Sequence, residues 1–151
     1  MILNQPDWQN KLANSLIELC DKRSVNFRSI LPKDVPFEAG VILITKVEDD
    51  YEIPYWIECA DNIRHRIQGG LLMSGMDEKG FFKELIDRKF YANLEDAKQF
   101  LREKCILRWL RIKDNHYRNA LTHFSKAILI PKCGMIGPPQ ASIFNNKSEN
   151  K

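Results

Sequence analysis

The chain has 151 residues, of which 44% are hydrophobic, so it can bury a core of ordinary size without disulfides or metals. No apolar stretch approaches the roughly 20 residues that cross a bilayer, and the first residues lack the basic start and apolar run of a signal peptide. We therefore expect a cytoplasmic protein with no membrane partner and exclude a membrane-spanning role.

The net charge of +3 is distributed unevenly along the chain. Residues 1–59 contain 6 Lys or Arg against 10 Asp or Glu, whereas residues 60–135 contain 15 against 9. A concentration of positive charge attracts phosphates, although a solvated face with scattered lysines gives the same count. Nucleic acid is therefore one candidate partner.

The four cysteines lack the close pairs that structural zinc sites use. They are Cys20, Cys59, Cys105 and Cys133. We interpret them as reduced thiols that pack as small core residues, and we expect no metal or other cofactor.

The first predicted element is a helix that Asp7 can cap. Its apolar residues share one stripe at helical spacing. These are Trp8, Leu12, Leu16 and Leu19. The stripe is either core or a dimer surface, so a homo-oligomer stays open, and residues 22–36 read as a connection.

A β-hairpin is predicted next, because residues 40–47 and 51–59 are rich in β-branched and aromatic residues and a polar turn separates them. Pro54 cannot donate to a ladder, so we expect it at a bulge or on a free edge. Asp61 or Asn62 can then cap a helix, which Gly69 and Gly70 weaken near its end.

The second half of the chain predicts two helices, a third strand and a last helix. A flexible loop is expected over residues 71–80, helices over 81–90 and from Asn93, and a strand over 105–112. Asp114 can cap the last helix, which ends at Pro131. From residue 136 the polar composition indicates a disordered tail.

This order of elements, with three short motifs, resembles the GIY-YIG nucleases. Before the first strand of that family stands a Leu-Pro-x-x-Pro segment, which is similar to Leu31-Pro32 and Val35-Pro36 here. Gly40-Val41-Ile42 then occupies the place of the first name-giving tripeptide. Ile42 stands where the family has a tyrosine.

The second motif of the family is Tyr-Ile-Gly followed by a helix that contains Asn-Leu-Arg-x-Arg. It resembles Trp56-Ile57-Glu58 and then Asn62-Ile63-Arg64-His65-Arg66. The resemblance assigns Arg66 to the catalytic arginine. The third motif resembles Arg118-Asn119-Ala120-Leu121-Thr122 and a later Pro131, with Thr122 in place of the metal-binding glutamate.

The resemblance implies an α/β (α+β) fold with a small mixed sheet, an antiparallel hairpin and flanking helices, plus an added N-terminal helix. It divides the chain into an N-terminal helix and connection (1–30), a GIY-YIG-like domain (31–135) and the tail (136–151). It also implies a phosphodiesterase site with tyrosines at the nucleophile, an arginine on the phosphate and a glutamate on a divalent metal.

The implied catalytic site is vestigial in this chain. Its residues would be Arg66, Tyr55, Trp56, Glu58 and Thr122. A neutral threonine cannot replace a carboxylate on Mg²⁺. Tyr55 at a bulge and Glu58 at the strand end are possible substitutes, so Mg²⁺ or Mn²⁺ would bind only if the site were active.

We expect four arginines to form one basic face for nucleic acid, with DNA as the first candidate. They are Arg64, Arg66, Arg111 and Arg118. The functional hypothesis is a catalytically degenerate member of the family that keeps this face. The alternatives are a protein-interaction or structural module on the same fold and an active endonuclease with a rearranged site.

Overall fold

The computed structural model describes residues 6–72 and 80–135, and it confirms the expected α+β fold class. The helices are α1 (Pro6–Asp21), α2 (Ile63–His65), α3 (Phe81–Asp87), α4 (Leu94–Lys104) and α5 (Asn115–Leu129), with a 3-10 turn η2 (Pro32–Asp34) and a π-helical segment η3 (Arg66–Leu72). The strands are β1 (Val25–Asn26), β2 (Gly40–Glu48), β3 (Tyr51–Ala60) and β4 (Cys105–Arg111). The expected tail and residues 73–79 of the expected loop lie outside the described residues.

The four described strands form one sheet in the order β1-β4-β2-β3, and every ladder in it is antiparallel rather than mixed. The predicted hairpin forms its centre, because β2 pairs with β3 on one side and with β4 on the other. A central strand is covered on both faces, and residues 40–45 of β2 are accordingly all buried. This explains the continuous β-branched run in the sequence.

The bulge predicted at Pro54 is present. Ile44 pairs with Trp56 and Thr45 pairs with Pro54, so Tyr55 is the extra residue of β3. The outer edge of β3 at this point is covered by the chain after α5, since the Lys132 N–H donates to the Pro54 carbonyl at 3.1 Å. Because of the bulge, the side chains of Tyr55 and Trp56 both lie in the same hydrophobic cluster, although the two residues are adjacent in the sequence.

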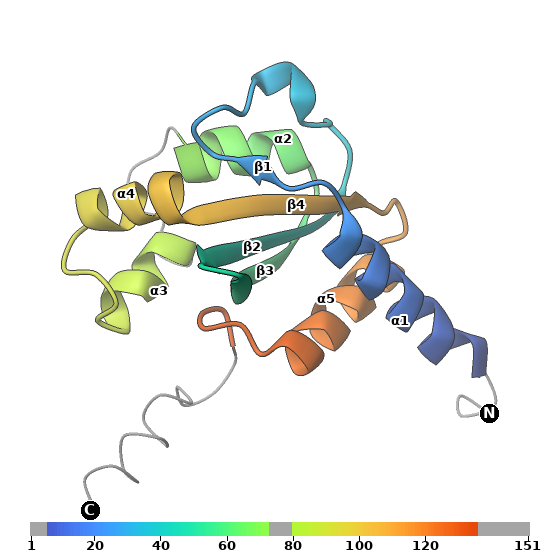
Figure 1. The fold of residues 1–151 in the computed structure, drawn as a ribbon. Coiled ribbons are helices and arrows are strands. Elements are labelled where there is room, and N and C mark those ends of the chain that lie inside the picture. The colour runs from blue at the N-terminus through green and yellow to red at the C-terminus, as the bar shows by residue number, and fades with distance from the viewer. Residues whose placement is uncertain (1–5, 73–79, 136–151) are drawn as a thin grey trace, which may run out of the picture.

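Helices cover both faces of the sheet (Figure 1). On one face, η3, α3 and α4 pack on a large cluster that contains Ile42, Trp56 and Leu107. On the opposite face, α1 and α5 pack on a smaller cluster. Leu16 and Leu19 of α1 belong to that cluster, so this part of the predicted apolar stripe is core. No helix in the described part of the chain is long and apolar enough to span a membrane.

The helix predicted after the hairpin is interrupted early. Asn62 caps it, as expected, by accepting a hydrogen bond from the His65 N–H at 3.1 Å. Only Ile63–His65 is α-helical, and the chain continues as the π-helical η3 through Gly69 and Gly70. Glycines weaken α-helical geometry, and π-helical turns are often found at functional sites.

Gly40 lies at a point of the sheet that leaves no room for a side chain. A Cβ atom there would lie 2.2 Å from the Leu110 carbonyl oxygen and 2.7 Å from Ile63 Cδ1. The first contact is with backbone of the paired strand, which cannot move without disturbing the ladder. We expect Gly40→Ala to lower the free energy of unfolding by about 1–3 kcal/mol, measured by urea denaturation. Gly69→Ala is the matched control, because a Cβ there meets nothing within 4 Å.

Candidate functional site

Arg66 lies at the start of η3 and faces the sheet. Its Nε donates to Glu58 Oε1 on β3, and both side chains are largely buried, with 18% and 19% of their surfaces exposed. The guanidinium also lies over Gly70, where a Cβ would be 2.2 Å from Arg66 Nη1. The structure thus brings two predicted catalytic residues together as an ion pair that ties η3 to the sheet.

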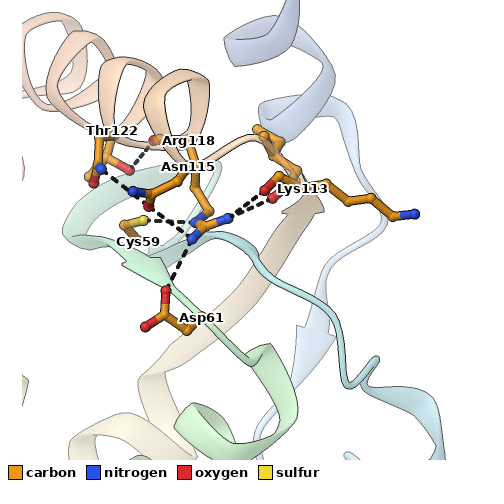
Figure 2. Close-up of polar contacts among 8 residues, drawn as sticks. Cys59, Asp61, Lys113, Asn115, Arg118 and Thr122 are labelled. Atoms are coloured by element: carbon orange, nitrogen blue, oxygen red, sulfur yellow. Dashed lines mark hydrogen bonds and ion pairs between the residues drawn. The ribbon is translucent and has the colours of Figure 1, made fainter.

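Arg118 of α5 is buried, with 5% of its surface exposed, and all five of its N–H donors bind groups of the same chain (Figure 2). Nε donates to Cys59 Sγ at 3.1 Å, and Nη1 donates to the carbonyls of Ile112 and Lys113 at 3.0 and 3.1 Å. Nη2 donates to Asp61 Oδ1 and Asn115 Oδ1, each at 3.0 Å. A guanidinium has five donors, so none is left for a phosphate in this conformation.

The predicted catalytic residues are divided between the two faces of the sheet. Thr122 is buried on α5, and its hydroxyl donates to the Arg118 carbonyl at 2.8 Å. On β3, Ile57 belongs to the cluster under α5, while its neighbours along the strand alternate to the other face. Glu58 and Arg66 therefore lie on the face opposite to Arg118 and Thr122.

The aromatic residues of the predicted site are packed in the core. Trp56 lies against Phe81 at a centroid distance of 5.4 Å, and its Nε1 has no hydrogen-bond partner among the described residues. Tyr55 packs between Phe90 and Phe100, and burial raises the pKa of its phenol. A raised pKa opposes formation of the tyrosinate that a nucleophile or general base needs. Ile42 is completely buried.

No cluster of three or more His, Cys, Asp or Glu side chains suited to a metal ion is found within residues 6–72 and 80–135. The carboxylate of Glu58, the substitute considered from the sequence, is engaged by Arg66.

Arg64 also binds within the chain. Its Nε donates to the Val35 carbonyl at 2.6 Å, and its guanidinium carbon lies 3.7 Å from the centroid of the Phe37 ring. The backbone N–H of Arg64 donates to the Pro36 carbonyl at 3.0 Å. Arg64 therefore anchors the segment between η2 and β2 to the helix after the hairpin.

Several arginines of the basic half form ion pairs within the chain. In the part of the chain that the structure describes, four arginines of residues 60–135 besides Arg111 are paired in this way. The pairs are Arg66–Glu58, Arg88–Glu84, Arg108–Glu52 and Arg118–Asp61. Three of these arginines, Arg88, Arg108 and Arg118, have side chains that are at most 12% exposed, and their charge serves the fold rather than an open surface.

Arg111, at the end of β4, is the predicted basic residue that stays accessible. Its side chain is 63% exposed and pairs with the half-exposed Glu38 at 3.2 Å. Two hollows meet at this residue, and we call them together the Arg111 cleft. The first has a volume of about 360 Å³ and the second of about 800 Å³.

The first hollow is basic and has an aromatic residue in its lining. Its basic residues are Lys22, Arg23, Lys33 and Arg111. Trp109, Pro36 and Asp34 complete the lining. Trp109 and Arg111 are two residues apart on β4, so they lie on the same face of the strand.

The second hollow lies between α1 and the start of α5. It is lined by Trp8 and Tyr117 and by basic or titratable residues from both sides. The titratable residues include Lys11, Lys113 and His116, together with the acidic Glu18 and Asp114. Asp114 caps α5 here by accepting from the Tyr117 N–H at 3.0 Å, and this hydrogen bond lowers the pKa of Asp114.

Sequence reasoning did not single out Arg23, Lys33 or Trp109. The local signals were the basic pair Lys22-Arg23 after the first helix and the Trp-x-Arg spacing at the end of β4. Neither signal shows by itself that these segments meet.

No protein-family model, curated protein or solved structure matches this chain.

Proposed function

We propose that this protein is a nucleic-acid-binding domain related to the GIY-YIG nucleases, that it has lost their catalytic site, and that it binds through the Arg111 cleft. The observation that carries the proposal is the juxtaposition of basic side chains with aromatic ones at the cleft. Proteins that bind single strands combine a positive groove with aromatic residues of this kind. DNA is the first candidate ligand.

The division of the inherited residues supports the loss of catalysis. Phosphodiester hydrolysis needs the nucleophile and the charge-stabilising groups around one reacting phosphate. Here Arg66 and Thr122 lie on opposite faces of a sheet, and Ile42 and Trp56 are buried. An active endonuclease would require Mg²⁺ or Mn²⁺ near Glu58 and release of that carboxylate from Arg66.

The element order supports the resemblance itself. A hairpin, a helix, a strand paired antiparallel to the first hairpin strand, and a helix ending before Pro131 follow one another as the family motifs imply. Of the four arginines expected on the basic face, only Arg111 lies in the proposed binding surface. Arg64, Arg66 and Arg118 have structural roles.

A cytoplasmic location fits this proposal. All four cysteines are free, as expected from the sequence. Burial raises the pKa of the Cys105 and Cys133 thiols to about 12. Both therefore stay protonated at neutral pH, and they act as packing residues.

A protein-interaction module is the second candidate function. It is favoured by exposed apolar side chains on the segment before β2, where Leu31 and Phe37 are 50% and 58% exposed. Such a module would show no steep dependence of nucleic-acid affinity on salt.

The test is a salt titration of oligonucleotide binding by fluorescence anisotropy. We expect log affinity to fall linearly with log salt, and Arg111→Gln to reduce the magnitude of that slope by about 0.7 on a single strand or 0.9 on a duplex. Arg102→Gln, at an exposed position of α4 near the start of β4, is the control of equal charge change. A slope near zero for the unmodified protein, or equal slopes for both variants, would contradict the proposal.

A further inference from the structure

We infer that the first hollow of the Arg111 cleft receives one unstacked base of a single-stranded nucleic acid, with Trp109 as the stacking surface and Arg23 and Lys33 on the adjacent phosphates. This inference rests on the proposed function and names the ligand class and the residues that read it.

Trp109 lies on a part of β4 whose outer edge forms no ladder with β1. Strand β1 pairs with β4 only at Ile106 and Leu107, so it covers the start of that edge and not Trp109. On the other side Trp109 is the register partner of the buried Ile42. Its ring is partly buried against the large core cluster and also lines the hollow.

The first wall of the hollow is set by the direction of β1. Because β1 runs antiparallel to β4, the residues before Val25 lie toward the end of β4 that carries Trp109. A hydrogen bond from Arg108 Nε to the Lys22 carbonyl, at 2.9 Å, fixes this approach. Arg23 therefore reaches the hollow although it is 86 residues from Trp109 in the sequence.

The second wall is the segment from η2 to β2, which carries Lys33 and Pro36. It is held by hydrogen bonds to the helix after the hairpin, including Arg64 Nε to the Val35 carbonyl and the Ile63 N–H to the Glu38 carbonyl at 2.9 Å. A pocket whose two walls are anchored in this way loses little conformational entropy on binding.

The rim carries positive charge that can be used by a ligand. Arg23 and Lys33 are exposed and form no ion pair with any residue in the described part of the chain. The nearby carboxylate of Asp34 accepts a hydrogen bond from the Leu31 N–H at 3.3 Å. Lys22 and Arg111 are in exposed pairs, which are weak and exchange readily for phosphate.

The shape favours a single strand over a duplex. A volume of about 360 Å³ is at the small end of ligand pockets, which is suited to one nucleotide and far too small for a double helix. Bases of a duplex are stacked on each other and present only their edges, so they cannot lie on Trp109. An unpaired base can stack on an aromatic ring whatever its identity.

The experiment compares a labelled ten-residue oligothymidylate with a blunt-ended duplex of ten A·T base pairs, which has no unpaired base, by anisotropy at fixed salt. We expect Trp109→Leu, which keeps an apolar side chain against the core, to weaken the single strand roughly 5- to 150-fold and the duplex hardly at all. Trp109→Phe should retain most of the affinity, because it keeps an aromatic surface.

Two exposed substitutions test the phosphate contacts without risk to the core. Arg23→Gln and Lys33→Gln should each reduce the single-strand salt slope by about 0.7, whereas Arg102→Gln should leave it unchanged. Competition with thymidine monophosphate separates a strand site from a site for free nucleotides. Displacement of the oligonucleotide by stoichiometric monophosphate would overturn the inference in favour of a nucleotide site.

The outcomes for the inference and for the proposed function differ. If both oligonucleotides bind with a steep salt slope but Trp109→Leu, Arg23→Gln and Lys33→Gln have no effect, this inference fails while the proposed function stands. If neither oligonucleotide binds the unmodified protein at low salt, the proposed function fails, and the inference fails with it.

Discussion

Arg118→Met is expected to lower the free energy of unfolding by about 3 kcal/mol. Hydrogen bonds that involve a charged group contribute roughly 1.5–3 kcal/mol each, but partners near the surface, such as Asp61, recover part of this by binding water. The loss comes mainly from the Ile112 and Lys113 carbonyls and from Asn115, which Arg118 joins at the point where β4 passes into α5. Thermal and urea unfolding would measure it.

Arg111→Met is the matched control, because it removes the same charge seven residues earlier. The Arg111 side chain is exposed and has one exposed partner. The free energy of unfolding of Arg111→Met should therefore stay within about 0.5 kcal/mol of that of the unmodified protein. The two variants should behave in the opposite way in binding, with a lower salt slope for Arg111→Met only. If Arg118→Met were as stable as the control and lost a phosphate contact, Arg118 would belong to the interface and its internal hydrogen bonds would be dispensable.

The parts of the fold that follow local rules could be predicted from the sequence. The bulge follows from the missing N–H of Pro54, and the caps follow from Asn62, Asn93 and Asp114, each of which accepts a backbone N–H. The hairpin follows from two β-branched runs around a short turn. None of these features depends on which distant segments meet.

The candidate site depends on such meetings, and this is why it could not be predicted. Its first hollow combines residues 22–23, 33–36 and 109–111, which are brought together by the two-residue strand β1 and by hydrogen bonds to backbone carbonyls. A strand of two residues, such as β1, is too short to show an alternation of apolar and polar residues in the sequence. The pairing of β1 with β4 is therefore the decisive non-local contact.

Arginine composition was a poor guide for the same reason. Arg66, Arg111 and Arg118 look alike in the sequence, yet the structure gives them exposed fractions that differ widely. Arg66 and Arg118 have partners on opposite faces of β3, because η3 and α5 pack on opposite faces of the sheet, whereas Arg111 lies at the exposed end of β4. Charge in a segment shows how many cations it has and not whether their donors are already used.

Thr122→Glu, which introduces the carboxylate that the GIY-YIG motif has at this position, is expected to destabilise the protein by several kcal/mol and to create no metal site. Thr122 is 5% exposed, and the donors of Arg118, one turn earlier on α5, are all used. Desolvation of an unpaired carboxylate costs several kcal/mol. Glu58 lies on the other face of the sheet, so the two carboxylates cannot bind one ion.

The pH dependence of this variant gives a sharper test than its stability at one pH. Burial raises the pKa of the new carboxyl group in the folded state above its value of about 4.3 in the unfolded chain. The folded state then binds the proton more tightly, so stability is best preserved below about pH 4.3 and is lost as the pH rises through the folded-state pKa. Thr122→Gln is the control, since it has similar volume and no charge.

The expected result is a difference in free energy of unfolding between Thr122→Glu and Thr122→Gln that is larger at pH 8 than at pH 5, and that is unchanged by millimolar Mn²⁺. Ligand binding to the native state would stabilise it by mass action, so a metal site would show as a rise in stability with Mn²⁺. That rise would contradict the division of the predicted catalytic residues between the two faces. A variant as stable at pH 8 as at pH 5 would mean that the new carboxylate has displaced Asp61 from Arg118, because pairing with a buried guanidinium removes the cost of its charge.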